Sequence, residues 1–468
     1  MCRSSVAITT PEPAANVSIH YRSDQPRANL NWVNSFLTLR YHGATMALPL
    51  RELVEACHAP NGQRERTARL AIGERAMDMK QPSHDSPIRR AVALGERIAA
   101  ASEEIERTRR IGEPLLTALH DARLLRLLLP RTVGGEQVEP STYFEATEAV
   151  SRYDASVGWN MFVANSSALI APFLEPETAR IIFTNPRTIV AWGPPNACVA
   201  EAVPGGYKIS GRWDFASGCR QANWIGVHAH VREADATLRQ NRFGRPTVRT
   251  LLMPVEQATL LDTWHTIGMR GTGSDSYRVD DVFVPEAFSG TREDPALRRE
   301  PGPLYAFTMQ GLYAAGVAAV AIGTARAMLA AFVELAQRKT PRGQGRLADS
   351  TTIRADVARC EARLGSARAY LLETLADIYA RADEIAPIGI EDRGQVRLAC
   401  ANAIHAAIEV ADWVYKAAGV DAIFPGALNP FERRFRDMHT LSQQIQSRSS
   451  HYEAVGQILL GGVPDGFL

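Results

Sequence analysis

The stretch that decides the fold is residues 205–219, GGYKISGRWDFASGC. Gly205 and Gly206 are a hairpin signal, and apolar or small residues then alternate with polar ones as far as Phe215, which predicts a strand with one buried face. An aromatic ring followed by a hydroxyl and a glycine can offer a planar heterocycle a stacking face, a hydrogen-bonding group and close backbone approach. Taken alone, the pattern is more typical of a sandwich strand and its turn.

Length and composition limit the function classes. The chain has 468 residues, which exceeds one ordinary core and predicts two or three packed subdomains. Its 52 Lys and Arg nearly balance its 51 Asp and Glu, which argues against nucleic acid or acidic lipid as a partner. The six cysteines lie far apart without a C-x-x-C or a metal-like His spacing, which favours reduced thiols in a cytoplasmic protein without a metal site.

The chain divides into four segments. Residues 1–85 show no sustained period and are predicted to be a loosely ordered extension, or the product of a start codon called too early. Residues 86–186 have helical apolar spacing, with Asp154 as the expected N-cap of one helix, and predict a helical domain. The chain has no apolar run of about 18 uncharged residues, as a membrane span requires, and no signal-peptide pattern.

The period changes to two in residues 187–290, which predicts a small β-barrel or sandwich with strands at 188–192, 199–203, 207–215, 224–231, 249–254 and 277–284. From residue 300 to 468 the pattern is helical again. A heptad-like seam over 351–380 and a second stripe that stops at Gly419 predict a four-helix bundle. We therefore expect an α+β protein with a helical domain, a β domain and a helical bundle.

This order resembles the acyl-CoA dehydrogenase superfamily over roughly residues 88–468. More closely it resembles the two-component flavin-dependent monooxygenase branch, of the hydroxyphenylacetate hydroxylase and dibenzothiophene monooxygenase type. Five motifs carry the resemblance: DASVGW at 154–159, GRWDFASGC at 211–219, GMRGTGS at 268–274, VDDVFVP at 279–285 and RDMH at 436–439. Each motif is modest alone, but five in the right order are fairly specific.

The resemblance implies a homotetramer that binds reduced flavin between the β domain and the bundle. Phe215 would flank the isoalloxazine ring, and the Ser217 hydroxyl would lie near flavin N5. Trp192 begins a segment in the place of a second flavin-edge loop, and Arg270 would be a cation beside the flavin. The alternatives are that Ser217 is an ordinary turn residue and that Arg270 pairs with a nearby carboxylate such as Asp280 or Asp281.

Further site residues follow from the same resemblance. Arg436, within a group that includes Arg433 and Arg434, would reach the flavin phosphate or ribose, or else form an intersubunit salt bridge. Trp159 would lie in the substrate pocket, and Asn165 stands about where a pocket histidine is expected.

The late helix, at about residues 436–450, distinguishes between dehydrogenation and monooxygenation. Residues 438–450 contain no Asp or Glu, which disfavours the carboxylate base of an acyl-CoA dehydrogenase. The histidine usual in the oxygenases is replaced by Gln444, which can donate a hydrogen bond but cannot act as a base near neutral pH. His439 is a possible substitute, although a surface or interface role is at least as consistent with its position. A substrate that needs no deprotonation would suit both changes.

We therefore expect the oxygenase component of a two-component flavin-dependent monooxygenase. It would take FMNH2 or FADH2 from a separate NAD(P)H:flavin reductase and use O2, through a C4a-hydroperoxyflavin, on a small aromatic or heteroatom-containing substrate. The alternatives are an acyl-CoA dehydrogenase-like FAD oxidoreductase and a non-catalytic homologue that acts as an oligomeric binding or scaffold protein.

Overall fold

The chain divides into two units, Met1–Ser83 and His84–Leu468. The computed structural model describes residues 86–383, 386–426 and 429–464, and four strands of the first unit. Those strands form two antiparallel hairpins: β1 (Val6–Thr9) pairs with β2 (Asn16–Ile19), and β3 (Phe36–Tyr41) pairs with β4 (Ala44–Pro49). The rest of the predicted extension over residues 1–85 lies outside the described residues.

The second unit begins with six helices: α3 (Pro87–Ala93), α4 (Gly95–Thr108), α5 (Glu113–Asp121), α6 (Pro140–Ser151), α7 (Ala155–Ser167) and α8 (Pro176–Phe183). The Asp154 carboxylate accepts the Val157 N–H at 3.0 Å and caps α7, as the sequence indicated. Every residue of α7 is buried, so this helix is surrounded on all sides. Its side chains therefore meet both the other helices and the β domain.

The β domain is one eight-stranded sheet in the order β10-β11-β7-β6-β8-β9-β12, with β5 paired to β8. Its strands are β5 (Val190–Trp192), β6 (Val199–Val203), β7 (Gly206–Ala216), β8 (Trp224–Arg232), β9 (Val248–Pro254), β10 (Thr259–Leu261), β11 (Asp275–Pro285) and β12 (Ser289–Gly290). The deciding stretch forms β7, which pairs antiparallel with β11. The Trp213 and Tyr277 rings stack inside the sheet at 5.6 Å, so alternate residues of β7 are anchored in the core.

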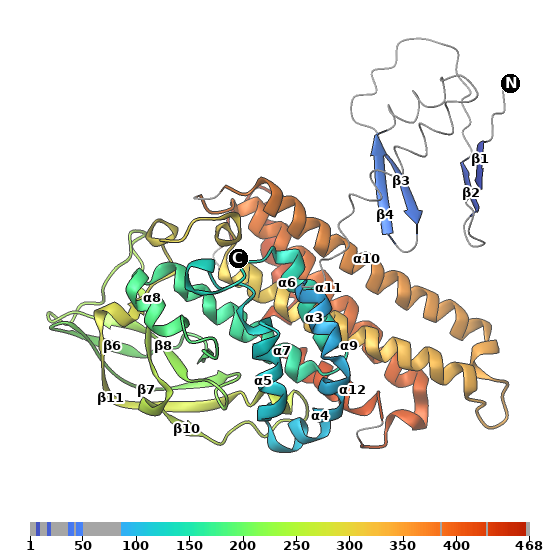
Figure 1. Cartoon of the computed structure of the whole chain (residues 1–468), viewed down its shortest axis with the longest axis horizontal. Coiled ribbons are helices and arrows are strands. Elements are labelled where there is room, and N and C mark those ends of the chain that lie inside the picture. Colours follow the sequence, from blue (N-terminus) through green and yellow to red (C-terminus); the bar gives the residue numbers. More distant parts are fainter. Residues whose placement is uncertain are drawn as a thin grey trace, which may run out of the picture. The chain divides into compact units, whose positions relative to one another are not determined.

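The C-terminal part contains three long helices, α9 (Met309–Arg338), α10 (Thr351–Arg381) and α11 (Ile390–Ala418), and two short ones, α12 (Glu432–Leu441) and α13 (Ser450–Leu459). Helix α11 ends at Gly419, whose φ of +62° is easily adopted by glycine. In contrast to the sequence expectation, helix α9 is long and apolar enough to cross a membrane, but most of its apolar stretch is buried inside the protein. It packs against α6, α7 and α11 (Figure 1).

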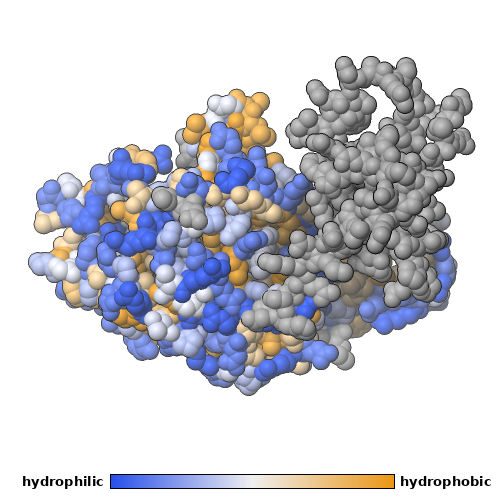
Figure 2. All heavy atoms as spheres, turned by 45° about the horizontal axis from the view of Figure 1, so that its top comes forward, coloured by the Kyte–Doolittle hydropathy of each residue, from blue (hydrophilic) through white to orange (hydrophobic). Residues whose placement is uncertain are grey.

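Loop 268–274 lies between β10 and β11 in the chain and packs against α12. A Cβ placed on Gly268 would come within 2.1 Å of the Arg436 carbonyl oxygen, so only glycine allows this close approach. Figure 2 shows hydrophilic residues mixed with hydrophobic ones over one face of the described part of the molecule. The C-terminal end of β7, loop 268–274 and helix α7 meet one another, and two of the sequence-predicted site residues, Ser217 and Trp159, lie at this junction.

Candidate functional site

Phe215 is held in an unusual conformation at the end of β7. Its φ is +63°, in the left-handed region that costs a non-glycine residue about 1–2 kcal/mol, yet its side chain is 63% exposed. The nearest ring is that of Trp264, edge-on at 6.3 Å between centroids. The backbone of Phe215 is therefore strained while its aromatic ring faces outward, as expected for a ring that stacks on a flat ligand.

Ser217 lies two residues further on and is 7% exposed. Its hydroxyl oxygen accepts a hydrogen bond from the Trp159 indole N–H at 3.0 Å and lies 2.7 Å from the Ser274 hydroxyl. The Ser274 hydroxyl is in turn 2.6 Å from that of Thr272, which lies 2.9 Å from the Met269 carbonyl oxygen. We call Ser217, Ser274 and Thr272 the hydroxyl relay.

The direction of this relay follows from counting protons. It contains three oxygen–oxygen contacts, and each needs a proton between its atoms because two unprotonated acceptors at such distances repel. Only three hydroxyl protons are available, and the Met269 carbonyl has none. Thr272 must therefore donate to Met269, Ser274 to Thr272, and Ser217 to Ser274.

This order fixes what Ser217 can offer a ligand. Its proton is directed to Ser274, and one of its two lone pairs receives the Trp159 N–H. The remaining lone pair can only accept a hydrogen bond. Ser217 is therefore an acceptor toward any group that lies over Phe215.

Helix α12 holds the relay in place through Asp437. The buried Asp437 carboxylate accepts the Met269 backbone N–H at 2.5 Å, at the start of the loop that carries Thr272 and Ser274. Burial raises the pKa of Asp437 to about 7, against the lowering effect of the nearby Arg433 guanidinium. Arg433 also forms ion pairs with Asp154 and, at 3.1 Å, with Glu106.

The two arginines predicted to contact the flavin are engaged within the chain. Arg436 forms ion pairs with Glu106 at 2.7 Å and with Glu432 at 2.5 Å, and also donates to the Ile267 carbonyl. Arg270 donates to the Glu106 and Thr266 carbonyls at 3.3 and 3.1 Å. These contacts are made inside one chain, so both side chains act as braces between loop 268–274, α4 and α12.

The alternative partners expected for Arg270 are not the ones it has. Asp280 pairs with Arg278 at 2.7 Å, and Asp281 pairs with Lys208 at 3.2 Å, both on the exposed side of the sheet. Arg270 does lie 3.9 Å from a nearby carboxylate, as the alternative expected, but that carboxylate belongs to Glu106, because β11 turns Asp280 and Asp281 toward its own neighbours.

Trp192 lies beside β7 but faces the core. A Cβ on Gly193 would come within 2.3 Å of the Asp214 carbonyl oxygen, so this segment runs directly against the strand before Phe215. The Trp192 ring itself packs edge-on against His228 at 5.1 Å and lies under the Arg292 guanidinium at 4.8 Å. The backbone of the segment, rather than the Trp192 ring, is what adjoins Phe215.

Asn165 is a structural bridge. Its side-chain oxygen accepts from the Leu127 and Leu128 N–H groups at 2.5 and 3.1 Å, and its amide donates to the Leu124 and Met161 carbonyls at 2.8 Å each. These four bonds use its whole capacity. Asn165 therefore has nothing left for a substrate, in contrast to its expected place in the pocket.

His439 and Gln444 occupy different surroundings. His439 lies 3.1 Å from the Asp412 carboxylate of α11, with the Phe435 ring at 4.2 Å. It is two positions after Asp437, about 200° further around α12, so it faces α11 rather than the relay. Gln444 instead forms a side-chain hydrogen bond with Tyr313 of α9.

Tyr313 connects Gln444 with the relay. Its ring meets that of Phe162 edge-on at 5.0 Å, and Phe162 meets the ring of Trp159 at 4.7 Å. Burial raises the pKa of Tyr313, so its hydroxyl stays protonated at neutral pH and can donate a hydrogen bond. A continuous aromatic wall, Trp159–Phe162–Tyr313, thus runs from Ser217 to Gln444.

Sequence reasoning missed Phe162, Tyr313, Thr272 and Ser274. Phe162 comes three positions after Trp159 on α7, and helical spacing was a signal for it. Thr272 and Ser274 lie inside the quoted motif at 268–274, where alternate hydroxyl residues were visible. Tyr313 left no local signal, because it reaches the site through packing between α7 and α9.

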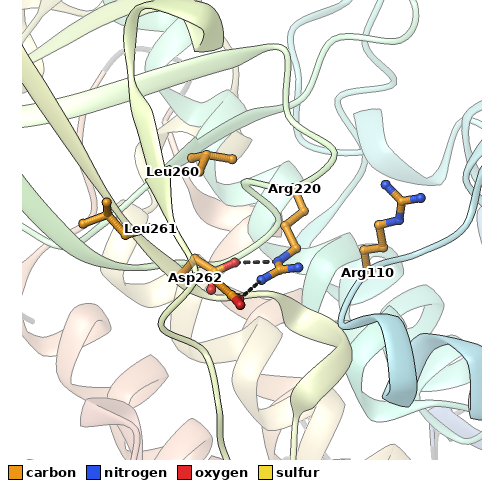
Figure 3. A pocket seen from close by; sticks show the side chains of 6 residues that line it. Arg110, Arg220, Leu260, Leu261 and Asp262 are labelled. Carbon is orange, nitrogen blue, oxygen red and sulfur yellow. Dashed lines mark hydrogen bonds and ion pairs between the residues drawn. The ribbon is translucent and has the colours of Figure 1, made fainter.

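A separate cavity of about 330 Å³ lies on the β domain, lined by Arg110, Arg220, Leu260, Leu261, Asp262 and Asp275. Arg220 is bound there by the Asp262 and Asp275 carboxylates at 2.6 and 2.5 Å (Figure 3). The lining contains no aromatic ring. It is therefore a poorer site for a flat heterocycle than the exposed face of Phe215.

Comparison with known proteins identifies the family of this chain. Residues 315–448 match the model of the acyl-CoA dehydrogenase C-terminal domain. The chain is 30% identical to an indole-3-acetate monooxygenase of Pseudomonas putida over 384 residues, which are 81% of this chain and 94% of the relative. The chain belongs to the two-component flavin-dependent monooxygenase branch of the acyl-CoA dehydrogenase superfamily. The prediction of family, fold class and oxidoreductase activity is thus confirmed.

Two further relatives extend the comparison. An FADH2-dependent resorcinol hydroxylase oxygenase component of Rhizobium sp. (strain MTP-10005) is 28% identical, over 82% of this chain and 98% of its own. The structure of XiaF from Streptomyces sp. in complex with FADH2 and glycerol has a TM-score of 0.73 and 25% identity, over 81% of this chain and 96% of that one.

The residues at the end of β7 fit a reduced flavin of this family. Flavin N5 carries a hydrogen in the reduced form and none in the oxidised form. Ser217 can only accept a hydrogen bond, so it matches the N5–H of reduced flavin. Oxidised flavin would instead place an N5 acceptor against the Ser217 oxygen, which is also an acceptor. Phe215 offers the ring face beside it.

The raised pKa of Asp437 gives a pH-dependent prediction. The unfolded chain releases this proton near pH 4 and the folded protein near pH 7, so the stability contributed by Asp437 falls as pH rises between these values. Asp437→Asn keeps an oxygen acceptor for the Met269 N–H but does not titrate. Its free energy of unfolding relative to wild type should rise by about 1–3 kcal/mol between pH 4.5 and pH 8, measured by urea unfolding. An equal difference at both pH values would contradict this account.

Proposed function

We propose that this protein inserts one oxygen atom of O2 into a small aromatic substrate, using reduced flavin bound between Phe215 and Ser217. The observation that carries the proposal is the forced direction of the hydroxyl relay, which makes Ser217 an acceptor toward the N5–H of reduced flavin. The relatives of this chain include a protein named as an oxygenase component. A separate NAD(P)H:flavin reductase would therefore supply FMNH2 or FADH2.

The bound reduced flavin supplies the electrons that activate O2. The chain contributes the surroundings of that reaction. Trp159 and Ser274 hold the Ser217 oxygen at a fixed position, and Phe215 positions the ring plane. The wall of Trp159, Phe162 and the partly buried Tyr313 would exclude water from the adjoining space, which would protect an oxygen-activated species from hydrolysis.

The groups at the far end of the wall indicate the kind of substrate. Gln444 and the protonated Tyr313 can donate hydrogen bonds, but neither can remove a proton from a phenol at neutral pH. His439 faces α11 and is not placed to replace them. We therefore propose an electron-rich ring that needs no deprotonation, such as an indole, rather than a phenol.

The experiment mixes anaerobic protein with FMNH2 or FADH2, and then with oxygenated buffer that contains indole-3-acetate or resorcinol. We expect a transient absorbance band distinct from both reduced and oxidised flavin, and one ¹⁸O atom from ¹⁸O2 in the indole product. Ser217→Ala should shorten the transient at least 10-fold and release hydrogen peroxide instead. Rapid flavin oxidation in the wild type without a transient or product would refute the proposal.

Ser274→Ala tests the relay more directly. Its loss frees the Ser217 proton, so Ser217 can also donate to oxidised N5. The ratio of the Kd for oxidised flavin to the Kd for reduced flavin should fall about 10-fold, which corresponds to a reduction potential of the bound flavin lower by about 30 mV. Ser276→Ala is the matched control, because the Ser276 hydroxyl bonds Asp214 at 2.6 Å and lies outside the relay. An unchanged ratio in Ser274→Ala would disprove the assigned direction.

We also propose a homotetramer located in the cytoplasm. Four cysteines of the described residues, Cys198, Cys219, Cys360 and Cys400, are free thiols, which supports a reducing compartment. Val420, Ile423 and Phe424, after α11, form an exposed apolar group that a neighbouring subunit would cover.

Light scattering after size exclusion tests the assembly. Wild-type protein should elute with the mass of four chains, and the double variant Ile423→Asp, Phe424→Asp should shift it to a smaller species. Phe243→Asp is the control, because Phe243 is equally exposed but lies in the β domain. A monomeric wild-type protein would contradict the proposed tetramer.

A further inference from the structure

Arg397 of α11 is a buried cation without an anion. Its side chain is 2% exposed, and no carboxylate of the described residues lies within ion-pair distance. Its one side-chain hydrogen bond in the described chain goes to the neutral Gln446 amide oxygen, and its Nε–H has no acceptor there. A buried charge normally needs a partner of opposite sign, because removing it from water costs several kcal/mol.

The titratable groups around Arg397 do not supply that partner. Burial raises the pKa of the Cys400 thiol to about 12, so the thiol is neutral at pH 7. Burial, and then the field of Arg397, lowers the pKa of His451, so the imidazole is neutral as well. Arg448, whose charge also lowers the pKa of His451, is a second cation, so this cluster has no anion among the described residues.

A second unsatisfied donor interacts with the same cysteine, Cys400. The Tyr143 hydroxyl of α6 is completely buried and has no hydrogen-bond partner in the described residues, while Tyr143 interacts electrostatically with both Cys400 and Tyr313. Burial raises the pKa of Tyr143, so its hydroxyl remains a donor. The Arg397 Nε–H and the Tyr143 O–H are thus two buried donors without acceptors, and a group with two acceptor oxygens could satisfy both.

This cluster adjoins the proposed substrate space. Tyr143 neighbours Tyr313. The side-chain oxygen of Gln446 accepts from Arg397, and the backbone N–H of Gln446 donates to the side-chain oxygen of Gln444 at 2.6 Å. Tyr313 and Gln444 form the end of the aromatic wall that begins at Ser217. A ring along this wall would therefore direct a substituent toward Arg397.

We propose that Arg397 and Tyr143 bind the carboxylate of an aromatic acid substrate. This inference rests on the proposed function, since it names the substrate class of the same site. The carboxylate is the missing counter-ion of Arg397, and its oxygens accept the free Arg397 Nε–H and Tyr143 O–H. The aromatic ring then lies on the wall that leads to Ser217.

The test compares two ligands that share one ring, indole-3-acetate and 3-methylindole. Binding is titrated anaerobically, with and without reduced FAD, so that acid recognition is measured separately from oxygen chemistry. Wild type should bind the acid at least 10-fold more tightly than the neutral ligand. Arg397→Met should weaken acid binding about 10- to 100-fold and leave 3-methylindole unchanged, while Arg397→Lys keeps part of the preference.

Further variants separate recognition from folding. Tyr143→Phe removes one donor and should weaken acid binding by several fold. Arg393→Met is the matched control one turn earlier on α11, because Arg393 donates to the Ile388 carbonyl at 3.0 Å. Arg397→Met should also unfold at an equal or higher temperature than wild type, since it removes an unpaired buried charge. Indole-3-acetate should raise the unfolding temperature of wild type and of Arg393→Met but not that of Arg397→Met.

The outcomes distinguish the two proposals. A wild-type protein without preference for the acid, or an Arg397→Met variant that keeps it, would overturn the carboxylate site even where the flavin transient is observed. Acid preference that depends on Arg397 in a protein without any flavin transient would support the carboxylate site and reject the oxygenase.

Discussion

The site depends on the proton order in the relay of Ser217, Ser274 and Thr272. Three hydroxyl protons must serve three oxygen contacts that end at the Met269 carbonyl, so each proton has one place. A serine at a strand end ordinarily rotates its hydroxyl to suit any neighbour. Here that freedom is absent, and the serine becomes a fixed acceptor. The ligand that satisfies it is a donor, as reduced flavin is at N5.

The rest of the unit keeps this relay in position. Strand β7 brings Ser217, helix α7 brings Trp159, and loop 268–274 brings the other hydroxyls, while Asp437 fixes the loop through the Met269 N–H. The ion pairs of Arg433 and Arg436 with Glu106 brace α12 against α4. These arginines are paired several times over, whereas Arg397 in the bundle has no anionic partner among the described residues. This contrast between cations that brace the fold and one without an anionic partner supports the proposed carboxylate site.

Local sequence patterns were sufficient for much of the fold. The alternation in β7, the Asp154 N-cap and the Gly419 helix end each depend on neighbouring residues, and the structure has all three. Strands β10 and β12 were missed because three and two residues are too short to show a period. The resemblance located Ser217 and Trp159, which lie in contact.

The partners of the site residues were not accessible in the same way. Glu106 precedes Arg436 by 330 positions and pairs with it through packing of α4 on α12, which no local pattern encodes. Asn165 was expected in the pocket because it stands about where the resemblance places a pocket histidine, but its helix face turns it to the backbone at 124–128. Sequence reasoning found the residue types of the site, and only the three-dimensional arrangement assigned their donors and acceptors.

The most direct measurement is the NMR spectrum of reduced flavin labelled with ¹⁵N at N5 and bound anaerobically to the protein. The account predicts an N5–H proton that is protected from exchange and shifted downfield by a hydrogen bond to Ser217. The shift should disappear in Ser217→Ala. An N5–H signal that matches free reduced flavin in the wild-type complex would contradict the claim that the relay makes Ser217 an acceptor for reduced flavin.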